Sequence, residues 1–264
     1  KISFVPTSGK KIVVKISASD VCPRYVVRAI TGVNAKAATP AWMIKRLERC
    51  GLRSISPIVD VTNYVLLEMG QPLHAFDLAK LNGSIEVRFA RAGERLQLLN
   101  QQTVELQPDM LVIADDKQPV ALAGVMGGAD SAVDDATADI LLESAFFMPS
   151  VIVGKSRKLG FGSDSSYRFE RGVDFANTQM ALDRATQLIL DICGGQAGEV
   201  TEVLGALPAR TPVKLRVARV HRILGVAVSA DKIAEILVSL GMKVERMTEE
   251  FSVIPPSYRF DITI

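Results

Sequence analysis

The most individual segment of this 264-residue chain reads Val59-Asp60-Val61-Thr62-Asn63-Tyr64-Val65-Leu66-Leu67-Glu68-Met69-Gly70-Gln71-Pro72-Leu73-His74-Ala75-Phe76-Asp77. Its first half predicts a helix over 60–69, because Gly70 and Pro72 supply a stop signal. Its second half sets His74 between Pro72 and Phe76. Taken alone, such a histidine is more often structural than catalytic, so the segment by itself names no chemistry.

Short strands are predicted on both sides of this segment. Alternating or β-branched apolar runs, most of them bounded by Gly, Pro, Asn or Asp, occupy residues 11–17, 24–30, 85–90, 95–99, 103–106, 110–114, 120–125 and 140–143. Helical spacing of apolar residues predicts helices over about 40–51 and 174–193. Many short strands with few helices indicate an α+β fold with a dominant β part, and not a doubly wound parallel sheet.

Two prolines, Pro208 and Pro212, mark a linker that neither a helix nor a central strand would tolerate. We therefore expect a lead-in strand or linker over 1–20, a main domain over 21–207 and a small domain over 208–264. In the small domain the pattern predicts strands over 213–217, 243–246 and 251–254 and helices over 220–224 and 229–240, as in a winged-helix module. The pattern breaks off at Ile264, so we interpret the chain as a piece of a longer protein, truncated within the small domain.

Composition indicates an ordinary globular protein. Apolar residues make up 48% of the chain, and the net charge of +2 is too small to argue for a polyanionic partner. Three scattered cysteines do not form a disulfide framework, and no apolar run reaches the roughly 18 residues of a membrane span. We expect a cytoplasmic protein with no membrane partner. Walker, GxGxxG and GxSxG motifs are absent, and with 2 histidines a histidine-rich metal centre is excluded.

Three ordered blocks carry a family signature. They are Asp60-Val61-Thr62-Asn63-Tyr64-Val65 with Gln71-Pro72-Leu73-His74-Ala75-Phe76-Asp77, then Leu141-Leu142-Glu143-Ser144-Ala145-Phe146-Phe147, and then Ser165-Ser166-Tyr167-Arg168-Phe169-Glu170-Arg171-Gly172-Val173-Asp174. Together they resemble the beta subunit of bacterial phenylalanyl-tRNA synthetase, and the resemblance extends from about Cys22 to Asp261.

The resemblance implies a fold and an activity. The implied fold is a β-rich editing module of unusual, sandwich-like topology with flanking helices, followed by a small winged-helix-like module. The implied activity is post-transfer editing, which is hydrolysis of the ester that wrongly joins tyrosine to tRNA(Phe). The aminoacylation site of the family belongs to the alpha subunit of an alpha2beta2 heterotetramer. ATP and Mg²⁺ would therefore serve the full synthetase, and no cofactor is expected in this piece.

The resemblance also assigns roles to residues. Glu143 would read the tyrosyl hydroxyl, because a carboxylate accepts strongly from a phenol; from the residues alone, a solvated glutamate at a strand end is the alternative. His74 would orient the terminal adenosine or a water, and its use as a general base stays open because it has no Asp partner in the pattern. Asn63 would hydrogen-bond beside it. Gly127 lies in the turn 124–128, whose N–H groups can stabilise an oxyanion, although a connection that merely needs positive φ explains the glycines equally well.

Two serines depart from the family pattern. Ser163 keeps a hydroxyl where threonine is common, and Ser165 puts a polar group where alanine often lines the amino-acid pocket, so both are assigned to substrate binding. Neither serine has a base adjacent in sequence, which argues against a nucleophile. Asp261 resembles the first ligand of a magnesium cluster whose other ligands lie outside this chain, so it would bind metal only in the full-length subunit.

One dense basic stretch adjoins the same loop. Its members are Lys155, Arg157, Lys158, Arg168 and Arg171. A solvated face is the usual explanation, but contact with the phosphates of the tRNA acceptor end fits its position. Two alternatives to editing stay open at this point: a non-catalytic tRNA-binding, DNA-binding or scaffolding segment, and a module that has lost its editing activity.

Overall fold

The computed structural model describes residues 6–263, which divide between Leu207 and Pro208 into two compact units. Within residues 6–263, no helix combines the length and the apolar character needed to cross a bilayer. The two units are described separately below.

Two stacked sheets form the larger unit. The four-stranded antiparallel sheet has the order β11 (Gln196–Leu204), β2 (Arg24–Thr31), β10 (Ile140–Phe146), β3 (Leu73–Asp77). The five-stranded sheet has the order β1 (Val14–Ile16), β4 (Ile85–Phe89), β7 (Leu111–Ala114), β8 (Pro119–Leu122), β9 (Met126–Gly127), and only the β1–β4 pair is parallel. A hairpin of β5 (Arg95–Gln97) and β6 (Thr103–Glu105) lies at its margin.

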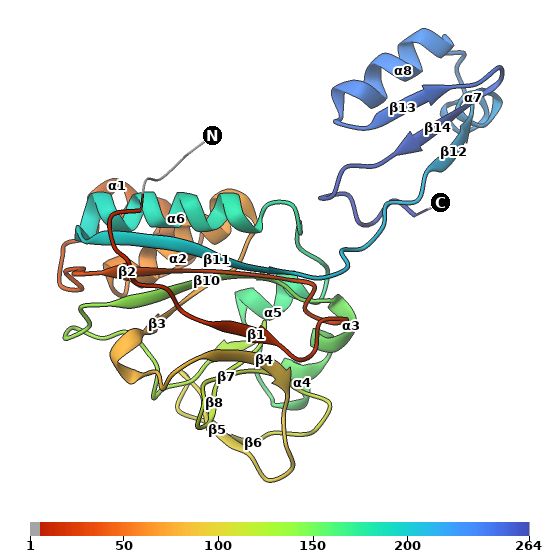
Figure 1. Cartoon of the computed structure of the whole chain (residues 1–264). Helices are drawn as coiled ribbons and strands as arrows, with labels where there is room; N and C mark the ends of the chain where they lie inside the picture. The colour runs from red at the N-terminus through yellow and green to blue at the C-terminus, as the bar shows by residue number, and fades with distance from the viewer. Residues whose placement is uncertain (1–5, 264) are drawn as a thin grey trace. The chain divides into compact units, whose positions relative to one another are not determined.

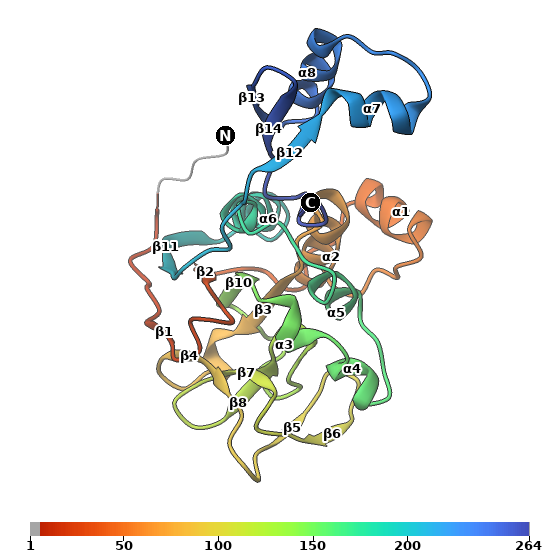
Figure 2. The same cartoon turned by 90° about the vertical axis from the view of Figure 1, so that its right-hand side faces the viewer.

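The four-stranded sheet is buried on both faces. Along β10, Leu141 and Ala145 join the apolar core shared with the five-stranded sheet, whereas Ile140 and Leu142 join a second core against helices. That second core is covered by α1 (Ala41–Arg49), α2 (Pro57–Met69) and α6 (Thr178–Cys193). Figures 1 and 2 show these helices on one side of the sheet and the five-stranded sheet on the other. Burial on both faces explains why apolar residues of β10 point to both sides of the sheet.

Local signals account for α2, the helix from the signature segment. Pro57 occupies its first turn, and Gly70 ends it in the left-handed conformation with φ of 69°. Asp60 is fully buried and accepts hydrogen bonds from the Thr39 hydroxyl (2.6 Å), the Ser54 hydroxyl (2.5 Å) and the Ile55 N–H (2.8 Å). This aspartate therefore anchors the loop before α2 to the helix.

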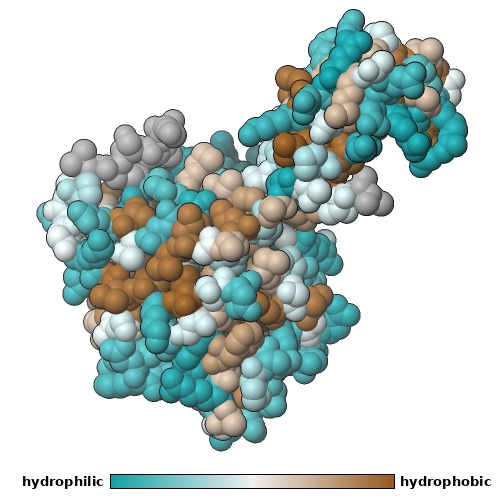
Figure 3. Space-filling view, turned by 45° about the vertical axis from the view of Figure 1, so that its right-hand side comes forward, coloured by the Kyte–Doolittle hydropathy of each residue, from teal (hydrophilic) through white to brown (hydrophobic). Residues whose placement is uncertain are grey.

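Short helical turns complete the larger unit. They are η1 (Leu78–Lys80), α3 (Pro149–Ile152), α4 (Lys155–Lys158) and α5 (Asp164–Phe169). The face of the molecule in Figure 3 shows hydrophobic areas on the larger unit between hydrophilic ones.

The smaller unit is a three-stranded antiparallel sheet with two helices. Its strands have the order β12 (Val213–Arg216), β14 (Glu250–Ile254), β13 (Lys243–Arg246), and its helices are α7 (Val217–Leu224) and α8 (Ala230–Ser239). Ile233, Phe251 and Val253 form its buried core. Its likeness to a winged helix stays a prediction.

The α+β class is confirmed, and the predicted strands and helices are present with shifted ends. Three differences concern the site. β10 continues to Phe146, so Glu143 lies within the strand and not at its end. β8 ends at Leu122, earlier than predicted, and leaves Val125 in a turn. β3, β9, β11 and the short helices η1, α3, α4 and α5 were not predicted.

Candidate amino-acid pocket

A cavity of about 300 Å³ opens in the larger unit. Its wall is built by α2, β3, β7, β8, the turn after β8, β9, β10 and both ends of α5. This volume lies at the small end of the range of about 300–1,000 Å³ for ligand sites. The cavity brings together all six residues that the sequence assigned to editing, which are Asn63, His74, Gly127, Glu143, Ser163 and Ser165. Their roles stay predictions.

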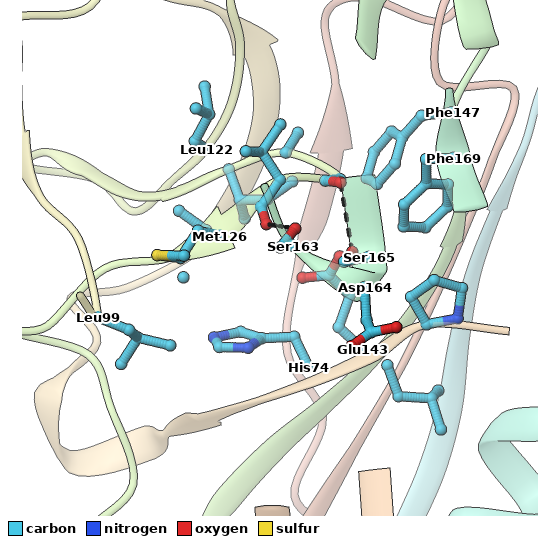
Figure 4. A pocket seen from close by; sticks show the side chains of 18 of the residues that line it. His74, Leu99, Leu122, Met126, Glu143, Phe147, Ser163, Asp164, Ser165 and Phe169 are labelled. Atoms are coloured by element: carbon cyan, nitrogen blue, oxygen red, sulfur yellow. Dashed lines mark hydrogen bonds between the residues drawn. The ribbon is translucent and has the colours of Figure 1, made fainter. Parts of the chain in front are cut away.

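Strand register explains how two of these residues meet. Glu143 on β10 is the Cα partner of His74 on β3. Residues two apart on a strand share a face, so Glu143 points to the same side as Leu141 and Ala145, into the layer between the sheets. Figure 4 shows the two side chains along one edge of the pocket.

Burial controls the charge of Glu143. The side chain is only 7% exposed, so the alternative of a solvated glutamate is wrong. Burial raises the pKa of the Glu143 carboxyl to about 7, against the opposing effect of the Tyr25 hydroxyl. Near neutral pH the pocket therefore holds a carboxyl group poised between its neutral and ionised forms.

His74 is partly buried in the same layer, and its Nε2 atom is shielded from solvent. Burial lowers the pKa of its imidazole to about 4, so the ring is neutral at pH 7. The ring stands edge-on to Phe76 with 4.4 Å between the centroids, and its Nε2 has no hydrogen-bond partner among residues 6–263. A buried nitrogen without a partner, on the wall of a cavity, is a free polar contact for a ligand or a water.

Gly127 is required by space. A Cβ built on Gly127 would lie 2.4 Å from His74 Cε1 and 2.7 Å from Nε2. Positive φ is instead found at Gly124, with φ of 67°. In the turn around them, the Val125 N–H donates to the Leu122 carbonyl and the Gly128 N–H to the Val120 carbonyl, so these two donors are already used.

The two serines fix α5 against this turn. Ser163 caps α5, accepting from the Ser166 N–H (3.0 Å) while its own hydroxyl donates to the Val125 carbonyl (2.7 Å). Ser165 donates to the Gly124 carbonyl (3.2 Å), and both bonds are drawn in Figure 4. Both hydroxyls are thus bonded to backbone carbonyls and not to a base, as a nucleophile would need.

The apolar part of the wall was not predicted. Phe147 and Phe169 stand edge to face with 5.1 Å between the centroids, and Leu99, Leu122 and Met126 also line the cavity. Phe147 and Phe169 lie inside the family blocks, which was the one available signal for them. Leu99 follows β5 and lines the cavity because of where the hairpin lies in the fold. No local sequence pattern indicates that position.

Most of the basic stretch is neutralised by carboxylates. Lys155 and Lys158 pair with Asp109, Arg168 pairs with Asp164, and Arg171 pairs with Glu170. No ion pair of Arg157 is found within the described part of the chain. The stretch therefore offers a polyanion less charge than its sequence indicates.

Asp261 belongs to the smaller unit, whereas the pocket residues belong to the larger one. Its carboxylate binds the Arg259 guanidinium through two contacts of 2.8 Å. Nowhere in residues 6–263 do three His, Cys, Asp or Glu side chains gather as metal ligands. These described residues do not by themselves form a magnesium site, and the role of Asp261 in the full-length subunit stays a prediction.

Comparison with known families assigns this architecture. A family described as the B3/4 domain matches residues 21–194. The chain belongs to this family. The tRNA synthetase B5 domain matches residues 213–264, so the B3/4 domain is followed by a second family module in the smaller unit.

Relatives of the whole chain confirm its resemblance to the beta subunit of phenylalanyl-tRNA synthetase. The chain is 61% identical over 251 residues to the phenylalanine–tRNA ligase beta subunit of Chromobacterium violaceum, covering 95% of this chain and 32% of that protein. It is 55% identical over 259 residues to the corresponding subunit of Thiobacillus denitrificans, covering 98% and 33%. The chain thus spans about a third of the length of the curated relatives it matches.

A solved structure shares the fold. The crystal structure of an N-terminal fragment of the phenylalanyl-tRNA synthetase beta subunit from Pyrococcus horikoshii aligns with a TM-score of 0.51 at 12% identity. The alignment covers 100% of this chain and 74% of that one. At this identity the likeness concerns the fold alone.

Proposed function

We propose that the B3/4 domain removes tyrosine from wrongly charged tRNA(Phe) by hydrolysing the aminoacyl ester. The observation that carries the proposal is the burial of Glu143 in a cavity whose other walls are largely apolar. A tyrosine side chain would place its ring against Phe147 and Phe169 and donate its hydroxyl to the Glu143 carboxylate.

Selectivity follows from the cost of an unpaired buried group. Phenylalanine has the same ring but no hydroxyl, so it would leave the Glu143 carboxylate desolvated without a donor. A site built around a hydrogen bond to such a hydroxyl rejects the analogue that lacks it by roughly 10⁴-fold or more. Phenylalanyl esters would therefore survive and tyrosyl esters would be removed.

The hydrolytic step needs placement more than strong acid–base chemistry, because an aminoacyl ester is already activated. The oxygen of a water attacks the carbonyl carbon, the bond to the ribose oxygen breaks, and a proton from the water ends on that ribose oxygen. Neutral His74, with its free Nε2, and Asn63 would orient this water or the terminal adenosine. Backbone donors near Gly127 would stabilise the oxyanion.

The proposal places the domain inside a larger enzyme. The relatives are beta subunits, so we expect an alpha subunit and tRNA(Phe) as partners in the cytoplasm. Aminoacylation, with its ATP and Mg²⁺, would belong to that assembled ligase, and this chain would carry no aminoacylation site of its own.

Hydrolysis of two substrates tests the proposal. The full-length beta subunit, assembled with the alpha subunit, is incubated with Tyr-tRNA(Phe) and with Phe-tRNA(Phe), and release of the free amino acid is followed. We expect rapid release of tyrosine, little release of phenylalanine, and loss of the first in Glu143→Gln. Binding of tRNA without release of tyrosine would contradict editing and support a scaffolding role.

A further inference from the structure

Tyr25 is a fully buried polar residue next to the pocket. It lies on β2, its side chain has 0% exposure, and it packs in the core between the sheets. Its hydroxyl makes no hydrogen bond of regular geometry with any described residue. Buried hydroxyls are rarely left so, which makes this one a candidate for a functional role.

Register brings this hydroxyl toward Glu143. Tyr25 is the Cα partner of Ala145, and Glu143 is the partner of Val27. Tyr25 and Glu143 are therefore diagonal neighbours on the face that points between the sheets, a separation that an aromatic side chain can span. Glu143 lines the cavity and Tyr25 does not, so of the two side chains only Glu143 can contact a ligand there directly.

The two groups influence each other. Burial and the charge of Glu143 raise the pKa of the Tyr25 phenol well above its ordinary value, while the Tyr25 hydroxyl acts to lower the pKa of Glu143. The other titratable groups around Glu143 are the Cys22 thiol before β2, His74 on β3 and Asp164 on the cavity wall. The cavity residues contributed by β7, β8 and the turn after β8 carry no titratable side chain.

We infer that Tyr25 is a positioning residue for editing: its hydroxyl holds one oxygen of the Glu143 carboxylate and leaves the other oxygen free for the phenol of a tyrosyl substrate. This inference rests on the proposed function. The carboxylate then accepts from two phenols, one from the protein and one from the substrate. The protein phenol keeps the acceptor ionised and correctly turned in a layer that otherwise favours the neutral acid.

Tyr25→Phe removes the hydroxyl and keeps the ring that fills the core. The first measurement is the titration of the Glu143 carboxyl by carbon NMR in this chain, with Glu143→Gln used to assign the signal. We expect the midpoint to rise in Tyr25→Phe. The matched control is Tyr64→Phe, whose lost hydroxyl bonds Arg46 and Glu68 outside the pocket and should leave the midpoint unchanged.

The second measurement is tyrosine release by the assembled synthetase between pH 6 and 8.5, corrected for spontaneous hydrolysis. A tenfold lower acid dissociation constant for Glu143 reduces its ionised fraction at pH 7 by about fivefold, so Tyr25→Phe should release tyrosine about fivefold more slowly at pH 7. The rate should recover toward that of the unsubstituted enzyme at pH 8.5. A merely structural defect would lower the rate equally at every pH.

Each result decides one claim. An unchanged NMR midpoint, or a raised midpoint with an unchanged rate at pH 7, overturns the role of Tyr25. If the unsubstituted enzyme releases no tyrosine, the proposed editing function fails. In that case the NMR titration still decides whether Tyr25 and Glu143 are coupled.

Discussion

Glu143 and His74 are directly opposed on the antiparallel strands β10 and β3, and desolvation in one layer shifts their pKa values in opposite directions. Burial raises the pKa of the acid to about 7 and lowers that of the base to about 4. Both groups are thereby pushed toward their neutral forms. An imidazole with so low a pKa is a weak base, so the geometry favours His74 as a group that orients a water and not as one that deprotonates it.

Glu143→Gln should weaken the preference for tyrosine. A hydrogen bond to a charged acceptor contributes about 1.5–3 kcal/mol, so tyrosine release should fall by roughly 10- to 150-fold. Release of phenylalanine should stay low. The measurement is the initial rate on each ester, with Glu68→Gln as the control, because Glu68 pairs with Arg184 and does not line the cavity. Equal rates in Glu143→Gln and the unsubstituted enzyme would contradict the role of the carboxylate.

Gly127→Ala should disable the site by moving the imidazole. The added methyl would lie only 2.4 Å from His74 Cε1 and push the ring aside, and a displacement of about 1 Å at a catalytic group can reduce the rate by on the order of 10²-fold. Because the obstacle is a side chain that can rotate, the domain should stay folded. Gly162→Ala is the matched control, since its Cβ would meet no heavy atom within 4 Å. Comparable rates in the two alanine variants would show that the position of His74 does not matter.

Ser165→Ala tests the departure from the family pattern. The Ser165 hydroxyl is bonded to the Gly124 carbonyl, so it presents less polarity to the cavity than the sequence suggests. We expect its removal to change tyrosine release by less than about threefold, and to cost about 1 kcal/mol of stability through the lost hydrogen bond. Rates on both esters and urea unfolding provide the check. A large gain in phenylalanine release would instead show that Ser165 restricts the pocket.

The sequence predicted the elements of the larger unit better than it predicted their contacts. Strands such as β2 and β7 are apolar runs with turn residues at their ends, a signal that local patterns carry. β3 was missed because a proline, Pro72, precedes Leu73–Asp77 and a histidine lies inside it. Pairing with β10 supplies the stability that the local pattern lacks.

The pocket shows the same division. The six assigned residues came from the resemblance to the family, and no spacing rule could have placed them in one cavity, because α2, β3, β10 and α5 meet only through strand pairing and tertiary packing. The need for Gly127 also escaped the sequence. It depends on the proximity of His74 from another strand and not on the backbone conformation of Gly127 itself.

The pH dependence of stability should reveal the cost of keeping Glu143 buried. The pKa of Glu143 rises from an ordinary 4.5 to about 7 on folding, so between these values the folded chain binds more protons than the unfolded chain. Stability from this group therefore falls as the pH rises from 4.5 to 7, and the loss is complete above 7. Gln cannot titrate. The free energy of unfolding of Glu143→Gln, relative to the unsubstituted chain, should thus increase by about 2–3 kcal/mol between pH 4.5 and pH 8.

Urea unfolding at the two pH values measures this difference. The single tryptophan, Trp42, lies on α1 and reports on the larger unit by fluorescence. His74 destabilises both proteins alike as the pH falls from 6.5 toward 4, because its lowered pKa keeps it neutral only when folded, and its effect cancels in the comparison. A difference that is the same at pH 4.5 and pH 8 would mean that Glu143 keeps its ordinary pKa. The carboxylate would then be hydrated in the pocket, and it could not reject phenylalanine through an unpaired charge.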